Sequence, residues 1–530
     1  VAFTGDAAVN LGAEIRSSAD SIDFGEGTVT LVANTIVDTT NNDEVASAAG
    51  NTIRFGGNVA GGTTSTLTLD AGTDSNITFV GDIGSTTVAG DPEVTTVTRI
   101  GDLTITDANV VSFGGRVHAG NFAQSAAKAT TGATTFEQGF DLAGNLTFDG
   151  YAITLKGDNT ATGSATFSNA GEYSLAQHGT LSADGGVLFN GTGATRLAGG
   201  LSSDGTDFVF QTTVVVDQNI TISTGDGAGE IRFDQAISGT GSLTLTAGTG
   251  DVVFADGANV GTQENMVGGL DVSGANLTLR SVYSSGAVTF TATGSMNTNS
   301  SYITDGDAIT FDGDVVFNHN TFISSSNGVT TGAGADVTFT GTVDSDGVDA
   351  ASTLTITAGT AGNVEFQSLV GDTQALGAVT VNNANDVTFN GLRAASFEQV
   401  DGGGITTFNL GNFTSGTDQA IGTTASGGVN ITAAAITINN RVDATDGAVT
   451  LNADGGVLTL AAAGDIMADL AVSLTGSSGI STAGDITTSA DNIDINSAVT
   501  LTGDVAIDSA DGNITFDTTI DGGFALGLTA

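Results

Sequence analysis

The sequence predicts an all-β protein folded as a parallel β-helix, a solenoid of short strands, and three observations support this prediction. Short runs of alternating apolar and polar residues recur along the whole chain. Thr, Val and Ile fill these runs, and β-branched residues suit the pleated, half-buried surface of a sheet. Turns rich in Gly, Asn and Asp separate the runs, and the chain has 78 Gly but a single Pro.

One stretch of about forty residues occurs three times and sets the pattern of the chain. The clearest copy is Thr353–Leu392. A second copy consists of Ser242–Phe254 and Gly268–Leu279, and a more diverged third copy consists of Thr66–Phe79 and Gly101–Phe113. A pattern that recurs at this scale and drifts between copies is typical of stacked-repeat architectures.

Strands are expected wherever the alternation is clear between turn residues. In the first half, outside the three copies, they are Ser21–Phe24, Thr28–Val32, Thr52–Phe55, Asn145–Phe148, Ile153–Lys156, Ala165–Phe167, Val187–Phe189, Phe208–Phe210, Ile220–Ile222 and Ile231–Phe233. In the second half they are Val288–Phe290, Ile309–Phe311, Val315–Phe317, Val337–Phe339, Ile405–Phe408, Val429–Ile431, Ile436–Ile438, Val449–Leu451, Val457–Leu460, Val472–Leu474, Ile493–Ile495, Val499–Leu501 and Ile514–Phe516.

Residues 1–530 are expected to form one continuous solenoid segment of a longer protein. Coils of about twenty residues, roughly two dozen of them, would stack about 4.8 Å apart into a rod. Residues 114–140 are expected to form an irregular excursion, in which Ala123–Ala129 makes one helical turn or a loop. Residues 423–530 are poor in Phe and rich in Ala, so we expect a thinner end of the rod.

The alternation predicts one buried and one exposed face for each strand. If Val364 and Phe366 point inward, Glu365 between them points outward. Arg232 and Thr388 occupy the same outward position in their own strands. Asn side chains in the turns are expected to form ladders between coils. The alternative fold is a row of tandem β-sandwich domains, which favours longer strands and large core anchors such as Trp, and this chain has no Trp.

The charge of the chain argues against nucleic acid and anionic lipid as partners. There are 58 acidic residues against 11 Lys and Arg, for a formal net charge of −47. Nucleic-acid binding needs cations that displace counterions from phosphates. Acidic surfaces favour divalent cations instead, although the same charge also serves solubility alone. The chain has no run of eighteen apolar residues, so we expect no membrane insertion.

Several sequence segments resemble the repeats of large bacterial surface and secreted proteins of the filamentous-haemagglutinin-like type, which are built of β-strand repeats. They are Leu243–Phe254, Leu376–Gly391 and Asn513–Ala530. The resemblance implies a right-handed parallel β-helix, export from a bacterium, and a structural or adhesive role outside the cell. The secretion domain found at the N-terminus of such proteins is not visible in this sequence.

Residues for catalysis are scarce. The three histidines, His118, His178 and His319, lie far apart and outside any metal-binding motif, so we expect exposed or turn histidines. The Gly-rich segment Gly225–Glu230 resembles a phosphate loop, but the pattern predicts no helix after it. Many Asp pairs could serve glycoside hydrolysis, so no single pair is informative. We therefore expect no enzyme, with a polysaccharide-active β-helix enzyme as an alternative.

Calcium is the cofactor that the sequence favours, since Ca²⁺ prefers carboxylate and carbonyl oxygens. One candidate turn carries three carboxylates in six residues, namely Asp344, Asp346 and Asp349. A second pair of acidic turns brackets a single expected strand and contains Asp305, Asp307, Asp312 and Asp314. The alternative is that these Asp residues bind no metal and form only the local hydrogen bonds of their turns.

The function expected from these observations is that of an extracellular or cell-surface structural protein. It would form a rod, filament, sheath or surface layer, or the stalk of an adhesin, and would self-associate through exposed strand edges. The alternative from another class is a glycan-binding adhesin that holds glycan or matrix on an exposed β face.

Overall fold

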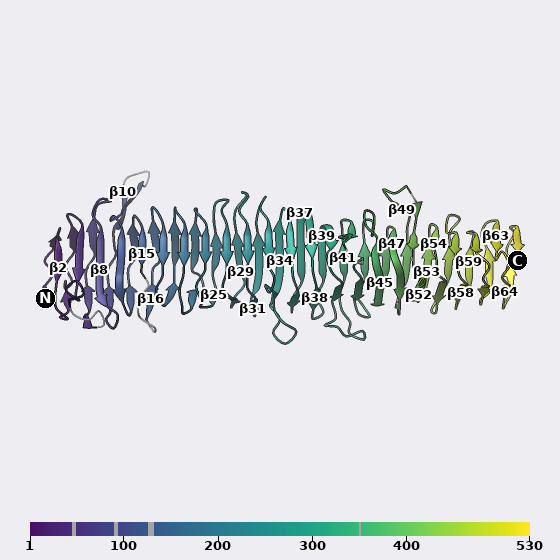
Figure 1. Cartoon of the computed structure of the whole chain (residues 1–530), viewed down its shortest axis with the longest axis horizontal. Coiled ribbons are helices and arrows are strands. Elements are labelled where there is room, and N and C mark those ends of the chain that lie inside the picture. Colours follow the sequence, from purple (N-terminus) through teal and green to yellow (C-terminus); the bar gives the residue numbers. More distant parts are fainter. Residues whose placement is uncertain (45–48, 90–93, 126–131, 349–350, 417) are drawn as a thin grey trace. The chain divides into compact units, whose positions relative to one another are not determined.

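The computed structural model describes residues 1–44, 49–89, 94–125, 132–348, 351–416 and 418–530. These residues form no helix, and their strands stack in parallel as a β-solenoid of about 23 turns, so the predicted fold class is confirmed. The chain divides into two compact units, Val1–Asn259 and Val260–Ala530. Each coil contributes three short strands, which appear in Figure 1 as neighbouring rungs within each unit.

Unit 1 contains three parallel ladders, here named 1A, 1B and 1C. Ladder 1A consists of β2 (Glu14–Arg16), β5 (Thr35–Asp38), β8 (Leu67–Gly72), β12 (Leu103–Ala108), β15 (Phe122–Gln124), β18 (Leu146–Phe148), β21 (Ala165–Phe167), β24 (Val187–Phe189), β27 (Phe208–Phe210), β30 (Ile231–Phe233) and β33 (Val252–Phe254). Ladder 1B consists of β3 (Ile22–Asp23), β6 (Ile53–Phe55), β9 (Ile77–Phe79), β13 (Val111–Phe113), β16 (Ala133–Phe136), β19 (Ala152–Leu155), β22 (Tyr173–Leu175), β25 (Thr195–Leu197), β28 (Val214–Val216) and β31 (Ile237–Gly239). Ladder 1C consists of β1 (Val9–Leu11), β4 (Val29–Leu31), β7 (Val59–Gly61), β14 (Val117–Ala119), β17 (Phe140–Leu142), β20 (Asp158–Ala161), β23 (Thr180–Ala183), β26 (Gly200–Ser202), β29 (Ile220–Ser223) and β32 (Ser242–Thr246), with Ile83 bridging β7 and β14.

Unit 2 repeats the same arrangement in ladders 2A, 2B and 2C. Ladder 2A consists of β34 (Gly269–Gly274), β37 (Val288–Thr298), β39 (Ile309–Phe317), β41 (Val337–Phe339), β44 (Val364–Phe366), β46 (Val387–Phe389), β48 (Ile405–Phe408), β53 (Ala435–Ile438), β56 (Leu458–Leu460), β59 (Ile480–Thr482), β62 (Val499–Leu501) and β65 (Ile520–Asp521). Ladder 2B consists of β35 (Leu277–Leu279), the later parts of β37 and β39, β42 (Val343–Ser345), the start of β47 (Leu392–Gln399), β51 (Ile421–Thr423), β54 (Val442–Ala444), β57 (Ile466–Ala468), β60 (Ile486–Thr488), β63 (Val505–Asp508) and β66 (Leu526–Thr529). Ladder 2C consists of β36 (Val282–Ser284), β38 (Ser301–Thr304), β40 (Thr321–Ser324), β43 (Leu354–Thr357), β45 (Leu376–Asn383), the end of β47, β52 (Val429–Ala433), β55 (Val449–Ala453), β58 (Val472–Gly476), β61 (Ile493–Ile495) and β64 (Ile514–Phe516).

Most of the three-residue strands bury their first and third residues and turn the middle one outward. In β44, Val364 and Phe366 are buried while Glu365 is exposed, as the alternation predicts. The buried phenylalanines stack on their counterparts in the next coil. Phe339 lies 4.8 Å from Phe311 and 4.7 Å from Phe366 between ring centroids, with nearly parallel rings. Stacked aromatic rings gain roughly 0.5–1.5 kcal/mol per pair beyond the burial of their area.

Asn and Asp side chains at the corners join each coil to the next. Asn409 donates to the Oδ1 of Asn390 at 3.0 Å and accepts from Asn439 at 3.0 Å, which confirms a predicted Asn ladder. Asp485 takes a related role, since its Oδ1 accepts a hydrogen bond from the backbone N–H of Ala506 at 2.7 Å. Acidic residues of this chain therefore also satisfy backbone donors at the corners.

The repeated forty-residue stretch corresponds to parts of two neighbouring coils. Within Thr353–Leu392, strand β44 pairs directly with β46, so that Phe366 faces Phe389. Within the third copy, β8 pairs with β12 and β9 pairs with β13. What recurs is thus the pattern of inward residues that each coil needs to pack on the next, and the forty-residue stretch is not a separate module.

The segment 114–140 differs from its prediction. Instead of an irregular excursion it contains β14, β15 and β16, which continue all three ladders of unit 1. Gln124, expected in a helical turn or loop, is the buried end of β15, and residues 126–131 lie outside the described residues. Excursions occur elsewhere, as the antiparallel hairpin of β10 (Ser85–Ala89) with β11 (Val94–Thr98) and the short pair β49 (Gly411–Asn412) with β50 (Asp418–Gln419).

Candidate functional site

The first predicted calcium turn places its carboxylates in separate roles. Asp344 lies in β42 with 9% exposure, and its Oδ1 accepts hydrogen bonds from the backbone N–H groups of Thr373 and Gln374 at 2.8 and 2.9 Å. Burial raises the pKa of Asp344, although these two hydrogen bonds oppose the rise. Asp346 accepts from the N–H of Val348 at 3.1 Å. Asp349 lies outside the described residues.

The second predicted pair of turns also makes contacts between coils. Asp312 and Asp314 lie within the continuous strand β39 rather than after a strand. Asp312 accepts from the hydroxyl of Thr340 at 2.7 Å, and Asp314 accepts from the N–H and hydroxyl of Thr342 at 2.8 and 3.0 Å.

The other two acids of that prediction lie in the turn before β39. Asp305 is exposed, and the backbone carbonyl of Asp307 accepts a hydrogen bond from Thr304. Within the described ranges, no group of three or more His, Cys, Asp or Glu side chains is arranged to hold a metal ion. Calcium binding by these turns stays a prediction.

The histidines fall into two kinds. His178 and His319 are exposed, as expected for turn residues. His118 differs, because it is only 4% exposed although it holds the outward position of β14. The hairpin β10–β11 covers it: a Cβ added to Gly84, at the start of the hairpin, would lie 2.7 Å from the His118 Cβ.

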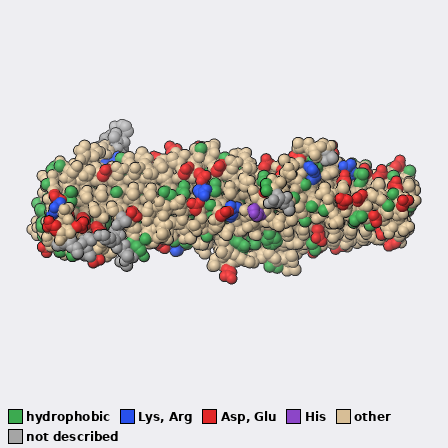
Figure 2. Space-filling model, in the orientation of Figure 1, with side chains coloured by type: hydrophobic (Ala, Val, Ile, Leu, Met, Phe, Trp, Pro, Cys, Tyr) green, Lys and Arg blue, Asp and Glu red, His purple; other side chains and the backbone are tan. Residues whose placement is uncertain are grey.

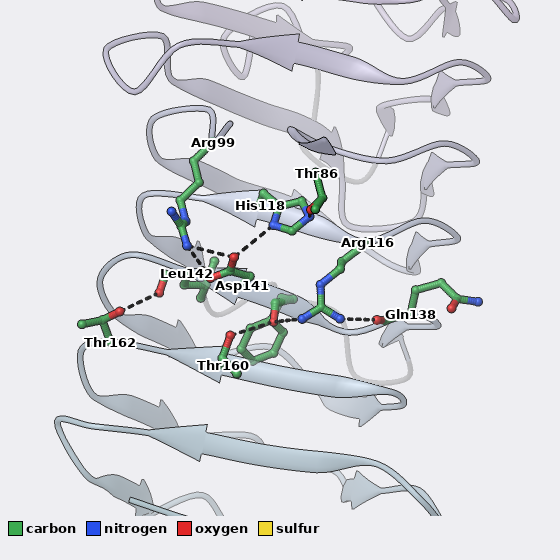
Figure 3. Close-up of polar contacts among 10 residues, drawn as sticks. Thr86, Arg99, Arg116, His118, Gln138, Asp141, Leu142, Thr160 and Thr162 are labelled. Carbon is green, nitrogen blue, oxygen red and sulfur yellow. Dashed lines mark hydrogen bonds and ion pairs between the residues drawn. The ribbon is translucent and has the colours of Figure 1, made fainter. Parts of the chain in front are cut away.

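A chain of polar contacts runs through His118 and is drawn in Figure 3. The His118 Nε2 lies 3.1 Å from the hydroxyl of Thr86, and its Nδ1 lies 3.2 Å from Asp141. Arg99 donates to both carboxylate oxygens of Asp141 at 2.7 and 2.8 Å. Arg116 donates to nearby backbone carbonyls and lies beside the cluster. We name Thr86, Arg99, His118 and Asp141 the His118 cluster.

The charges of the His118 cluster fix its protonation at neutral pH. Burial raises the pKa of Asp141, but the hydrogen bonds and charge of Arg99 outweigh it, so that this pKa lies below its ordinary value. Burial lowers the pKa of His118, and the charges of Arg116 and Arg99 add to this effect, while the hydrogen bond that the ring donates to Asp141 and the charge of Asp141 oppose it. The imidazole is therefore neutral at pH 7, between an anionic carboxylate and a hydroxyl.

The cluster has two chemical capacities. A hydroxyl, an imidazole and a carboxylate in this order can pass a proton from Thr86 towards the ring, as in activated nucleophiles. The same contacts also join three segments that are distant in sequence. The residues were missed in the sequence because only the stacking of β14 on β17, where His118 faces Asp141, brings them together.

A second titratable cluster is a column of carboxylates in ladder 1A. Asp38, Asp70 and Asp107 occupy partner positions in β5, β8 and β12. Burial raises the pKa of Asp70 to about 6; the hydrogen bond from the N–H of Gly72 opposes this, and the charges of Asp38 and Asp107 add to it. At neutral pH, ionisation of Asp70 therefore destabilises the folded state.

Two shallow grooves lie on unit 1. One, of about 490 Å³, runs over the glycine corners of three coils and includes Gly185, Leu188 and Val209. The other, of about 390 Å³, is polar and includes Gln177, His178 and Gln218. Figure 2 shows acidic side chains scattered over the visible face.

Comparisons with known proteins do not assign this chain to a family. Within the described part of the chain, the solenoid includes no helix with the length and hydropathy to span a bilayer. No protein-family model matches the sequence, and no curated protein or solved structure matches it either.

Proposed function

We propose that this chain is a structural segment of an extracellular bacterial protein. It would form part of a filament, sheath or surface layer, or the stalk of an adhesin, and would resemble proteins of the filamentous-haemagglutinin-like type. The observation that carries the proposal is the uniformity of the coils. From β4 to β63 the inward positions hold mostly Val, Ile, Leu or Phe, with Ala or a polar residue such as Asn159 in a minority of strands, while the outward positions accept Thr, Arg or Glu.

This pattern is what selection for an extended scaffold would leave. In a quasi-one-dimensional repeat protein, each coil contacts mainly its neighbours, so the inward packing is constrained and the outward residues vary freely. The net charge of −47 supports a role in which the surface stays soluble and avoids phosphate-bearing partners. Self-association through unpaired strand edges would extend the scaffold.

Immunogold labelling tests the proposed location. Antibodies raised against the whole chain should label intact cells of the source organism as strongly as permeabilised cells. Labelling that requires permeabilisation would contradict an extracellular role. Sedimentation velocity of the purified chain over a range of concentrations tests self-association, which predicts species larger than the 52.1 kDa chain. A single monomeric species at all concentrations would contradict it.

Glycan binding is a second candidate function, and the polar groove near His178 favours it. Amide side chains such as Gln177 and Gln218 can donate to and accept from sugar hydroxyls. Binding on a glycan array should weaken when both residues are replaced by Ala. It should persist in the control Gln138→Ala, which removes an exposed amide of the same unit outside the groove. Equal binding by both variants would remove the groove from consideration.

A further inference from the structure

The two legs of the hairpin β10–β11 converge on one pair of side chains. Thr86 belongs to the first leg, and Arg99 follows directly after the second. Both reach residues of the underlying ladder: Thr86 contacts His118 of β14, and Arg99 contacts Asp141 of β17. His118 and Asp141 face each other in neighbouring coils and are themselves hydrogen-bonded. The pair therefore serves as the anchor of the hairpin (Figure 3).

The anchor has a defined direction of hydrogen bonding when the imidazole is neutral. Arg99 keeps Asp141 ionised, so the carboxylate of Asp141 can only accept hydrogen bonds. The Nδ1 of His118 must therefore carry a proton and donate it in the hydrogen bond to Asp141. The Nε2 of a neutral ring is then an acceptor. The hydroxyl of Thr86 must consequently donate to it.

Protonation of the ring would disturb this arrangement in two ways. The Nε2 would become a donor, so the Thr86 hydroxyl would have to turn and accept from it instead of donating. The cluster would also gain positive charge near two guanidinium groups, those of Arg99 and Arg116, whose charges already lower the pKa of the ring. Among the residues that the structure describes, Asp141 of β17 is the anion that acts on His118, and Arg99 and Arg116 are the cations. One carboxylate would then neutralise only one of three cations in a half-buried site.

We propose that His118 is an acid-sensitive latch that holds the hairpin β10–β11 against the coils at neutral pH and releases it in acid. The sign follows from the direction of the shift. The pKa of His118 is lowered in the folded state, so its contribution to stability is present at neutral pH. That contribution is lost as the pH falls through the folded pKa, below the ordinary value of 6.5.

Release would be local because the coils beneath the hairpin are held by their own ladders. A two-stranded hairpin is marginally stable alone in water and depends on its attachment. Detachment would expose the outward face of β14 and free a ribbon of Ser, Thr and Val with two unpaired edges. The inference does not depend on the proposed structural function, since it concerns only the attachment of one hairpin.

Hydrogen exchange followed by mass spectrometry tests the latch in the whole chain. After correction for intrinsic exchange, hairpin amides such as those of Thr87 and Val97 should exchange faster at pH 5 than at pH 7, by up to roughly tenfold for each unit by which the folded pKa of His118 lies below 6.5. Peptides from β24 and β27 serve as internal references and should not change. The variant His118→Gln, which cannot titrate, should lose the pH step. The matched control His178→Gln replaces an exposed histidine and should keep it.

A second measurement keeps the test decisive if His118→Gln loosens the hairpin at every pH. The chain has only three histidines, so selective labelling allows the ring of His118 to be titrated by NMR. The midpoint of hairpin opening in the wild type should agree with the midpoint of this titration. Equal corrected exchange at pH 5 and pH 7, a pH step that survives in His118→Gln, or midpoints more than about one pH unit apart would overturn the proposal.

Discussion

The carboxylate column predicts that replacing Asp70 by Asn stabilises unit 1 at neutral pH. Asp70 lies between Asp38 and Asp107 in successive coils, at a spacing of about 4.8 Å between neighbouring strands. Ionisation of Asp70 is therefore opposed both by burial and by two neighbouring carboxylates. Asn keeps the oxygen that accepts from the N–H of Gly72 but carries no charge.

The size of the effect follows from the pKa. A rise from the ordinary 3.8 to about 6 is roughly two units, and each unit corresponds to about 1.36 kcal/mol. The ceiling is about 3 kcal/mol, and solvent screening of this partly exposed group reduces it to roughly 1–2 kcal/mol. Because the folded pKa is raised, ionisation destabilises the folded state above pH 6. The advantage of Asn should therefore be full at pH 7 and fade between about pH 6 and pH 4.

Native-state hydrogen exchange of β5, β8 and β12 is the suitable assay, because long repeat arrays do not unfold in one two-state step. The control Asp74→Asn changes an exposed residue of the same coil and should stay within about 0.5 kcal/mol at every pH. An Asp70→Asn variant that is no more stable at pH 7, or whose advantage is the same at pH 4, would refute the reasoning.

Two further substitutions test packing. Phe339→Ala removes a fully buried ring from the middle of a stack and should cost about 3–5 kcal/mol in the local exchange free energy of β41, whereas the outward Thr338→Ala should change it by less than about 0.5 kcal/mol. Gly199→Ala should disrupt its corner, since the new Cβ would lie 1.9 Å from the carbonyl oxygen of Gly179, while Gly200→Ala meets nothing closer than 3.4 Å and should be tolerated. Native-state hydrogen exchange of β26 compares the two glycine variants, and equal exchange in both would contradict the tight stacking of these corners.

The strands with two inward apolar residues could be predicted from the sequence. β24 and β27 show the alternation plainly, and both were expected with the bounds that they have. The strands that the sequence did not reveal have weaker patterns. β26 has one apolar residue, Leu201, and β20 turns Asn159 inward with no exposure. The amide of Asn159 donates to carbonyls of Gly157 and Thr180, and this compensation depends on the folded coil.

The clusters could not be predicted because the coils differ in length. His118 and Asp141 are 23 residues apart, and Arg99 and Asp141 are 42 apart. Counting a fixed period along the sequence does not bring these residues into register. The inserted hairpin that buries His118 gives no distinct signal either, since its Thr and Val residues resemble those of any coil.

Cross-linking of engineered cysteines tests the register of the coils most directly. Thr437 and Thr459 are outward-facing partners in β53 and β56, and Ser481 is the partner of Thr459 in β59. The chain has no cysteine of its own, so two introduced thiols are the only ones present. Neighbouring coils place such partners about 4.8 Å apart and alternate coils about 9.6 Å apart. Dibromobimane, which fluoresces when it bridges two close thiols, should react with Thr437→Cys/Thr459→Cys and leave Thr437→Cys/Ser481→Cys unbridged. Equal bridging in both variants, or bridging only in the second, would contradict the stacking on which this account depends.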